Sequence, residues 1–279
     1  VSADTHASSR DKISGHIKVG AKSYPVYAIA EPRKLPWKKL KVDVVLECTG
    51  RFVKDGAAKD HLKAGAGVVI ISAPAKGKGD VKTFVRGVNH SEISSEKIIS
   101  NASCTTNCVA PVTQVLHDAF GIEKAMMTTI HSYTADQRLV DAPHKDPRRG
   151  RAAAQNIIPT TTGAAVATTK VIPELDGKFD GLAVRVPSIV GSLTDFTFVL
   201  KKDASAEAIN RALTRAAKDK QKGLLAVTSE PIVSTDIVGN DHSAIVDLNF
   251  TKVVDGNLVK VLAWYDNEWG YSYRLVDMI

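Results

Sequence analysis

The sequence predicts an α/β protein in two parts, a parallel sheet with connecting helices followed by a mixed sheet that carries helices. In the first hundred residues, short apolar segments rich in β-branched residues alternate with helix-like segments, which is typical of parallel strands buried on both faces. Beyond Cys104 the strand-like segments show period-2 patterning instead. The 279 residues suffice for two ordinary domains and a substantial core.

The parallel strands are expected at residues 42–48, 68–72 and 98–101, with a short helix at residues 60–66 between the first two. Gly67 closes that helix. In open parallel sheets ligands lie at the carboxyl ends of the strands. The polar segments that follow these three strands are therefore expected to border one crevice.

The second part is expected to begin close to Cys104. Asp203 and Ser205 are plausible caps for its last helix. Period-2 and helical spacing predict strands at 124–131, 181–186, 194–201, 243–249 and 259–265, and helices at 108–120, 161–171 and 205–220.

Composition places the chain among ordinary globular proteins, with 44% apolar and 24% charged residues. The three cysteines lack metal-ligand spacing, so we expect a reducing compartment, the cytoplasm, and no metal site. No apolar run approaches the roughly 20 residues of a membrane span. The net charge of +7 suits an anionic substrate, but the basic residues are scattered without an aromatic pattern, so no specific nucleic-acid partner is predicted.

The strongest chemical signal is Cys104, which stands where a predicted strand turns into a predicted helix. Free N–H groups and the helix dipole favour a thiolate nucleophile there. We interpret Cys48, inside an apolar strand, and Cys108, one turn beyond Cys104, as buried apolar side chains. A thiolate nucleophile needs a base within reach, and His131, at a strand end, is the best candidate. On local sequence alone, a structural role for His131 stays open.

Residues 100–108 (SNASCTTNC) resemble the active-site motif of glyceraldehyde-3-phosphate dehydrogenases, which is long and specific. The resemblance covers essentially the whole chain. Other family segments follow in order at 35–37 (LPW), 47–52 (ECTGRF), 72–76 (SAPAK), 128–134 (TTIHSYT), 157–165 (IIPTTTGAA), 185–187 (RVP) and 264–271 (WYDNEWGY).

This resemblance implies the type I, phosphorylating enzyme of glycolysis and gluconeogenesis. It would oxidise glyceraldehyde 3-phosphate to 1,3-bisphosphoglycerate through a thiohemiacetal and a thioester on Cys104, with His131 as base and oxyanion partner. Hydroxyls and backbone N–H groups suit phosphate, and arginine adds a charged fork. The matching anion sites are Ser103, Thr105, Thr162 and Gly163 for inorganic phosphate, and Thr134 and Arg185 for the substrate phosphate.

The cofactor implied by the resemblance is NAD, with NADP not excluded. Residues 133–157 match a long loop that packs against the cofactor of a neighbouring subunit, which implies a homotetramer and gives the basic cluster at 148–151 an interfacial role. The positions that match cofactor-binding residues of the family are Thr49, Gly50, Phe52, Ser72, Asn267 and Tyr271.

The resemblance further implies an incomplete Rossmann-type NAD(P)-binding domain, residues 1–103 and 267–279, and an α+β catalytic domain, residues 104–266. The chain lacks a G-x-G-x-x-G fingerprint followed by an acidic ribose ligand. We therefore expect about one βαβ unit to be missing before Val1, and one or two helical turns after Ile279. The chain as written is expected to bind cofactor poorly, and the missing part would decide between NAD and NADP.

Three other functions are weighed against this one. Erythrose-4-phosphate dehydrogenase shares the fold, but residues 132–134 and 160–163 keep phosphate-binding types, although Val166 and residues 188–191 depart from the common family pattern. A nucleic-acid or scaffold-binding homologue is permitted by the charge but has no need of Cys104 with His131. A cysteine hydrolase using that pair would lack an orienting third residue and leave both anion sites unexplained.

Overall fold

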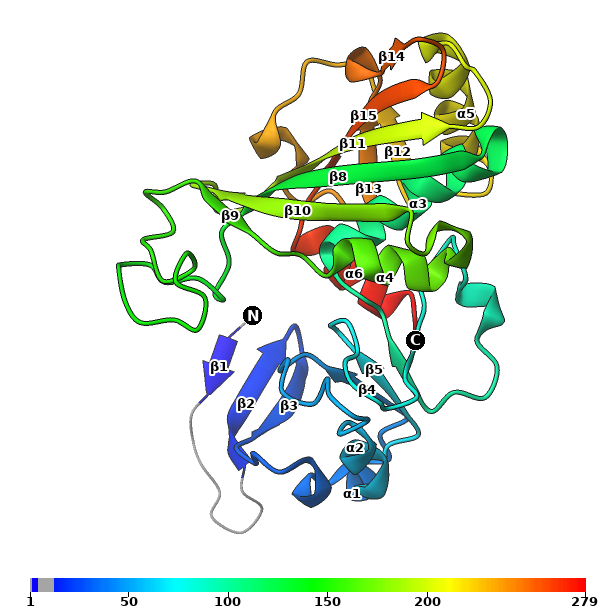
Figure 1. Ribbon diagram of the computed structural model, residues 1–279. Helices are drawn as coiled ribbons and strands as arrows, with labels where there is room; N and C mark the ends of the chain where they lie inside the picture. Colours follow the sequence, from blue (N-terminus) through cyan, green and yellow to red (C-terminus); the bar gives the residue numbers. More distant parts are fainter. Residues whose placement is uncertain (1, 5–12) are drawn as a thin grey trace.

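The computed structural model describes residues 2–4 and 13–279; residue 1 and residues 5–12, which fall in the predicted first domain, lie outside the described part. Sheets of different kinds divide the described chain into two halves (Figure 1). The lower half in that view holds a parallel sheet and a small antiparallel sheet, and the upper half holds a large mixed sheet. The predicted fold class is confirmed.

The parallel sheet is covered by apolar side chains on both faces. Val69 packs with the residues around α1 (Trp37–Leu40) and α2 (Lys59–Lys63), whereas its neighbour Ile70 packs on the opposite face with Phe84. Successive strand residues point to opposite faces, so a strand buried on both must be apolar throughout. The strands lie in the order β4 (Val44–Glu47), β5 (Val68–Ile71), β7 (Ile98–Ser100) and β6 (Lys82–Thr83).

A three-stranded antiparallel sheet precedes the parallel one and was not predicted. Most described residues of its second and third strands are exposed or half-buried, so they carry no apolar pattern that a sequence reading detects. Gly20 takes a left-handed φ of 58° at the turn between them. The strands are β1 (Ser2–Asp4), β2 (Ile13–Val19) and β3 (Lys22–Tyr27).

The mixed sheet of the upper half has two parallel pairs, β8 with β10 and β12 with β13, and its other pairs are antiparallel. β14 (Lys252–Val254) lies off the main path and pairs with β15. The order is β12 (Leu225–Thr228), β13 (Ala244–Asp247), β15 (Leu258–Tyr265), β11 (Ser192–Leu200), β8 (Ile122–Ser132), β10 (Phe179–Val186) and β9 (Ile158–Thr160).

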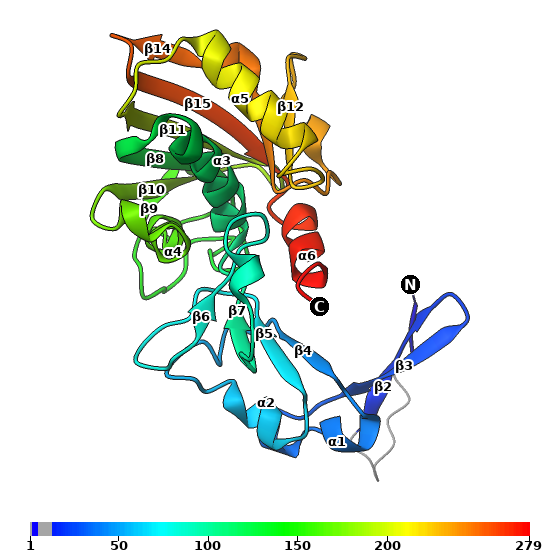
Figure 2. The same cartoon turned by 90° about the vertical axis from the view of Figure 1, so that its right-hand side faces the viewer.

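Three helices pack on this sheet: α3 (Cys104–Phe120), α4 (Ala164–Val171) and α5 (Ala206–Lys218) (Figure 2). Their apolar faces and the inward residues of the strands form the largest core cluster. The predicted cap at Ser205 is confirmed, because its hydroxyl accepts the Ala208 N–H at 3.2 Å. The three helices therefore cover one face of the mixed sheet, and α3 extends from that face toward the parallel sheet.

The last helix, α6 (Trp269–Val276), contacts both halves. Leu275 joins the core cluster of Ile70 and Phe84 on the parallel sheet. Arg274, which is buried, donates from Nη1 to the Gly223 carbonyl of the upper half at 3.1 Å. The chain thus returns to the parallel sheet after completing the mixed one. Short 3-10 helices lie in the connections at η1 (Pro32–Lys34), η2 (His90–Glu92), η3 (Pro173–Leu175), η4 (Ser234–Ile237) and η5 (Leu248–Phe250).

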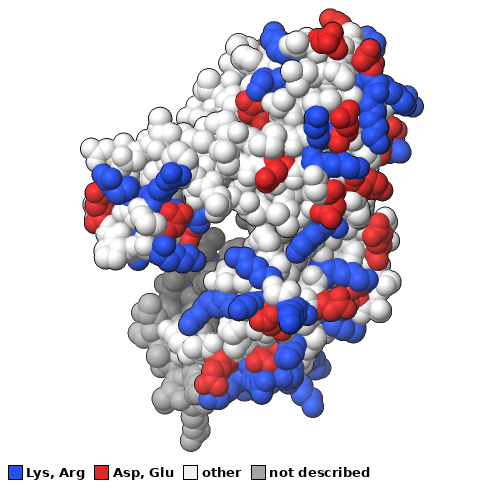
Figure 3. Space-filling model, viewed as in Figure 1, with Lys and Arg blue, Asp and Glu red and all other residues white. Residues whose placement is uncertain are grey.

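Charges of both signs lie side by side on the surface. On the face shown in Figure 3, Lys and Arg side chains are interspersed with Asp and Glu over both halves. Arg33, in the basic segment 33–41, pairs with Asp60 at 2.9 Å, and Lys63 pairs with the same carboxylate at 3.1 Å. Such exposed pairs contribute about 1 kcal/mol or less. No helix in the described part is both long and apolar enough to cross a membrane.

Candidate active site

Cys104 is the first residue of α3, one turn before the predicted start of that helix. Ala102 takes a left-handed φ of 53°, and Ser103 then returns to an extended conformation. The Ser103 hydroxyl accepts the Thr106 N–H at 3.2 Å, which caps the helix. This sharp turn places the thiol beside the unpaired N–H groups of the first helical turn.

The turn is held from inside by Asn107. Its side-chain NH₂ donates to the carbonyls of Asn101 and Ser103, each at 3.0 Å. Asn101 in turn donates its backbone N–H to the Ile71 carbonyl, so the turn is also tied to β5. Both groups sit in the buried interior. These hydrogen bonds of Asn107 and Asn101 therefore hold the turn that carries Cys104.

His131 lies beside the thiol. Its Nε2 is 3.5 Å from Cys104 Sγ, and its Nδ1 is 2.7 Å from the Ser132 carbonyl oxygen. The carbonyl contact calls for a proton on Nδ1, whereas Arg185 Nη1, a donor 2.9 Å from the same nitrogen, calls for a lone pair there, so these contacts do not assign the ring proton. The ring is buried, with 4% of the residue exposed. This is the arrangement that a base for Cys104 requires.

Arg185 lies on the other side of the imidazole. β8 and β10 pair in parallel with His131 opposite Arg185, which brings together two residues far apart in the chain. Arg185 Nη1 is 2.9 Å from His131 Nδ1 and donates to the Ser132 carbonyl at 2.9 Å and to Thr134 Oγ1 at 3.4 Å. Its Nε is buried without a partner. The guanidinium is therefore held on one side by the reacting pair, while its Nε donor stays buried.

Burial opposes charge on both members of the Cys104–His131 pair. It lowers the pKa of His131 to about 4, helped by the positive charge of Arg185 and opposed by the bond to Ser132. Burial also raises the pKa of the Cys104 thiol, against the opposing effects of Thr105 and Arg185. Desolvation therefore opposes the thiolate that the start of the helix favours.

The other two cysteines behave differently from each other. Cys108 is fully buried, which confirms the prediction of an apolar role. Cys48 is exposed, so the prediction that it is buried is wrong. The strand ends one residue earlier, at Glu47, and Cys48 begins the loop that follows. Among the described residues, no group of His, Cys, Asp or Glu side chains is placed to hold a metal ion.

Thr105 is connected to the core by a tyrosine that the sequence reading missed. Thr105 Oγ1 lies 2.9 Å from the Tyr265 hydroxyl, which lies 2.8 Å from Thr129 Oγ1. Burial raises the pKa of Tyr265, so its single proton is retained. The Tyr265 ring also meets the His131 ring edge-on, with centroids 6.0 Å apart. The alternation of β15, which points Tyr265 inward, is the only sequence signal for this contact.

Thr162 and Gly163 stand at the start of α4. Gly163 is the N-cap residue, and the Thr162 hydroxyl accepts the Ala164 N–H at 3.2 Å. Arg149, from the loop at 133–157, donates to Thr160 Oγ1 at 2.9 Å and to the Thr161 carbonyl at 3.1 Å. In the described chain neither Thr162 nor Gly163 hydrogen-bonds to Cys104 or His131. The structure thus joins Thr134 and Arg185 to the reacting pair more closely than it joins these two.

The predicted cofactor residues lie in two groups. Thr49, Gly50 and Phe52 follow β4, and Ser72 follows β5, so all four border the carboxyl edge of the parallel sheet. The second group comes from the end of the chain. The Asn267 side-chain oxygen accepts from Gly191 N at 3.1 Å and Ser192 Oγ at 2.9 Å, and Tyr271 donates its hydroxyl to the Ala102 carbonyl at 3.2 Å.

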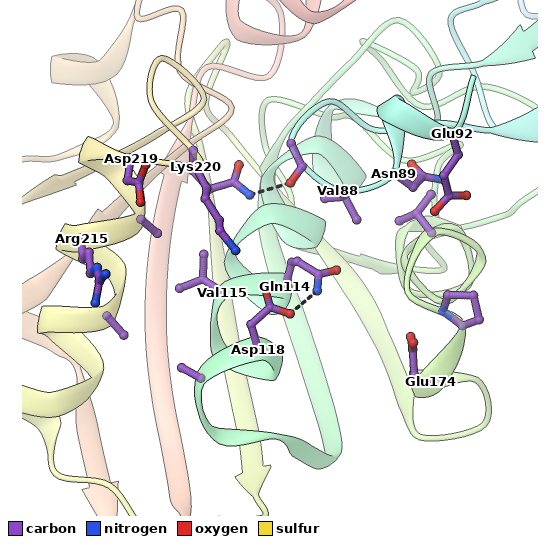
Figure 4. Close-up of a pocket in the computed structure, with 17 residues that line it drawn as sticks. Val88, Asn89, Glu92, Gln114, Val115, Asp118, Glu174, Arg215, Asp219 and Lys220 are labelled. Carbon is purple, nitrogen blue, oxygen red and sulfur yellow. Dashed lines mark hydrogen bonds between the residues drawn. The ribbon is translucent and has the colours of Figure 1, made fainter. Parts of the chain in front are cut away.

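A cavity of about 670 Å³ lies away from all of these residues (Figure 4). It is bordered by η2, the second half of α3 and the end of α5. Gln114 donates to Asp118 at 2.7 Å on its wall, and Arg215 and Glu174 line it from other elements. None of the predicted site residues lines this cavity. Of the predicted site residues, Thr162 instead lines a separate cavity of about 720 Å³, together with Thr160 and Thr161.

Comparison with known proteins gives matches over both halves. A family model described as glyceraldehyde 3-phosphate dehydrogenase, C-terminal domain, matches residues 103–267. A model described as the NAD binding domain of the same protein matches residues 3–55. The first match alone covers more than half of the chain, and it begins one residue before Cys104.

Similar proteins occur in distant organisms. A glyceraldehyde-3-phosphate dehydrogenase of Mycobacterium avium is 58% identical over 249 residues, which is 89% of this chain and 73% of that protein. One of Geobacillus stearothermophilus is 52% identical over 265 residues, covering 94% and 78%. The chloroplastic glyceraldehyde-3-phosphate dehydrogenase A of Chlamydomonas reinhardtii is 50% identical over 264 residues, covering 94% and 70%.

Proposed function

The chain belongs to the glyceraldehyde-3-phosphate dehydrogenase family, and we propose that Cys104 is its nucleophile and His131 its catalytic base. The activity is the NAD-dependent oxidation of glyceraldehyde 3-phosphate to 1,3-bisphosphoglycerate. The observation that carries the residue assignment is the 3.5 Å approach of Cys104 Sγ to His131 Nε2. A histidine ring nitrogen within reach of a thiol suits a covalent mechanism.

The first step forms the C–S bond. Cys104 attacks the aldehyde carbon while its proton moves to His131 Nε2. The oxyanion that develops lies against the first N–H groups of α3 and receives that proton from His131, which completes the thiohemiacetal.

The second step needs a hydride acceptor, and NAD supplies that function when bound. His131 removes the hydroxyl proton of the thiohemiacetal as the hydride departs, which leaves a thioester on Cys104. Inorganic phosphate then attacks the thioester carbon and expels the Cys104 sulfur, giving the acyl phosphate. The lowered pKa of His131 keeps the imidazole ring neutral at neutral pH, so that it can accept this proton.

Two anion-binding groups are proposed around the reacting pair. Arg185 and Thr134 would hold the substrate phosphate, a role supported by their mutual contact and by the positive charge of Arg185 beside His131. The hydroxyl groups and first-turn N–H groups at the starts of α3 and α4 suit a second anion. For inorganic phosphate we propose Ser103, Thr105, Thr162 and Gly163.

The residues beside the parallel sheet fit a dinucleotide. The NH₂ of Asn267 makes no hydrogen bond in the described chain, although its oxygen is fully engaged, so a donor is left for the nicotinamide carboxamide. Gly50 takes a left-handed φ of 68° with no atom within 4 Å of where a Cβ would stand, which leaves open space at the strand end. We propose that NAD is held by Thr49, Gly50, Phe52, Ser72, Asn267 and Tyr271.

The domain division and the assembly are also proposals. The packing of Leu275 on the parallel sheet supports a cofactor domain of residues 1–103 and 267–279 and a catalytic domain of residues 104–266. Leu139, Val140 and Ile157, in and beside the loop at 133–157, are 67%, 74% and 70% exposed. So much exposed apolar surface on one loop supports its burial by a neighbouring subunit in a homotetramer. The reducing setting suggested by the free cysteines supports a cytoplasmic location.

The test is an absorbance assay of NAD reduction with glyceraldehyde 3-phosphate, on protein expressed from its complete coding region. We expect sustained turnover only with phosphate present. Cys104→Ser should lose at least about 1,000-fold in kcat, because the nucleophile is removed. Cys48→Ser, which changes an exposed cysteine, should keep wild-type activity. A folded wild-type protein that reduces neither NAD nor NADP would refute the dehydrogenase activity and favour the scaffold alternative.

A further inference from the structure

A buried hydrogen-bonded chain lies beneath the proposed cofactor residues, and none of the roles assigned above uses it. Its centre is Glu47, the last residue of β4, of which 3% is exposed. Glu47 Oε2 accepts from His61 Nε2 at 2.7 Å, and Oε1 accepts from Thr49 N at 2.9 Å and from the Thr49 hydroxyl. In the described chain no Lys or Arg pairs with this carboxylate. A buried charge of this kind depends on its donors.

Trp37 determines which nitrogen of His61 carries the proton. The indole N–H of Trp37 only donates, and it lies 3.0 Å from His61 Nδ1. Nδ1 must therefore accept, which places the single ring proton on Nε2, where Glu47 needs a donor. The two rings stack with centroids 6.2 Å apart at 23°. Trp37, His61, Glu47 and Thr49 thus form one chain in which every bond points toward the carboxylate.

The same group contacts the other proposed cofactor residues of this edge. The Glu47 carbonyl accepts the Ser72 N–H at 3.1 Å, and the Phe52 ring meets His61 edge-on, with centroids 6.0 Å apart at 87°. Thr49 also accepts the Arg51 N–H at 3.1 Å. Three of the four residues proposed to bind NAD here are therefore held by Glu47 or His61.

We propose that His61 and Trp37 are positioning residues for NAD, acting through Glu47 on the segment 49–52. This inference rests on the proposed cofactor site and names residues that do not touch the cofactor themselves. Without the His61 donor, the Glu47 carboxylate is under-paired and turns away, which releases Thr49 and its backbone. Part of the free energy of NAD binding is then spent on ordering the segment 49–52, so NAD binds more weakly. Cys104 and His131 lie on other elements, so turnover at saturating NAD is preserved.

The test compares variants of His61 by calorimetric titration with NAD and by steady-state kinetics. His61→Phe keeps a ring between Trp37 and Phe52 but deletes both hydrogen bonds. It should raise the Kd for NAD and the KM for NAD about tenfold, with kcat within about twofold of wild type. His61→Gln offers an N–H to Glu47 and a carbonyl to Trp37, and should bind NAD closer to wild type than His61→Phe does.

Two further variants separate positioning from general stability. Val261→Ala removes buried carbons from the mixed sheet, so it should lower Tm without changing the Kd for NAD. Trp37→Phe deletes the indole N–H together with the smaller ring of the indole, so it should raise the Kd about threefold, and it serves in place of His61→Phe if that variant does not fold.

An unchanged Kd in His61→Phe, or an equal rise in Val261→Ala, would overturn the inference. So would a fall in kcat with no change in Kd. These outcomes differ from failure of the proposed function, which would appear as a wild-type protein that neither binds NAD nor oxidises the aldehyde.

Discussion

The reacting centre and the cofactor edge are built in opposite ways. At the reacting centre, Cys104, His131 and Arg185 come from α3, β8 and β10 and already contact one another at 2.9 to 3.5 Å. At the cofactor edge, Thr49 and Gly50 are exposed loop residues, and their order comes from a buried network behind them. The comparison indicates that groups which react with each other must be preorganised in direct contact. A segment that binds a large ligand can instead be held in place by hydrogen bonds from buried residues beneath it.

The largest expected difference between the two regions follows from replacing the proposed base, His131. His131→Asn should lower kcat about 1,000-fold with little change in the Kd for NAD, because proton transfer is lost while the cofactor edge is untouched. His117→Asn, on the same half but at the end of α3, is the matched control and should stay near wild type. Steady-state kinetics and calorimetry measure the two effects. A His131→Asn enzyme with wild-type kcat would remove the histidine from the mechanism.

A smaller effect is expected at the support behind Thr105. Tyr265→Phe removes the hydroxyl shared by Thr105 and Thr129, so the Thr105 hydroxyl is no longer oriented. We expect the KM for inorganic phosphate to rise about fivefold, with the KM for NAD unchanged. Tyr24→Phe, at an exposed tyrosine of β3, is the control. A rise in the KM for NAD of equal size would mean that the two regions are not independent.

The smallest effect concerns pH. A histidine with its pKa lowered to about 4 stays neutral throughout the range above that value, and a thiol with its pKa raised stays protonated through neutrality. The active protonation state therefore spans both sides of neutral pH, and kcat/KM for the aldehyde should fall less than about twofold between pH 7.5 and pH 5.5. A half-maximal loss near the ordinary histidine pKa of about 6.5 would show that the imidazole is not desolvated.

Local sequence predicted the parts of the fold that depend on local patterns. The apolar runs at β4 and β5 carry strands buried on both faces, and Ser205 caps its helix because a hydroxyl there satisfies a free N–H. The exposed strands β2 and β3 lack such a pattern and were missed. Cys48 was placed wrongly because the strand ends one residue before it, and strand boundaries depend on tertiary contacts.

The site was predictable to the extent that short segments of the sequence contain it. The motif at 100–108 located Cys104 and the separate segment 128–134 located His131, but the contact of His131 with Arg185 depends on the parallel register of β8 and β10, which no local pattern encodes. The opposition of burial to charge on this pair cannot be predicted locally for a related reason, because desolvation is a property of the assembled core. Tyr265 and the Glu47–His61 pair likewise connect residues that only the fold brings together.

The central claim, that Cys104 carries the substrate, is tested most directly by trapping the thioester. The enzyme is mixed with glyceraldehyde 3-phosphate and NAD in the absence of phosphate, quenched in acid and analysed by peptide mass spectrometry. Our account predicts a single acyl group on Cys104, with none on Cys48 or Cys108, and its loss when phosphate is added before the quench. An acyl group on either of the other cysteines, or NAD reduction without any acyl-enzyme, would contradict it.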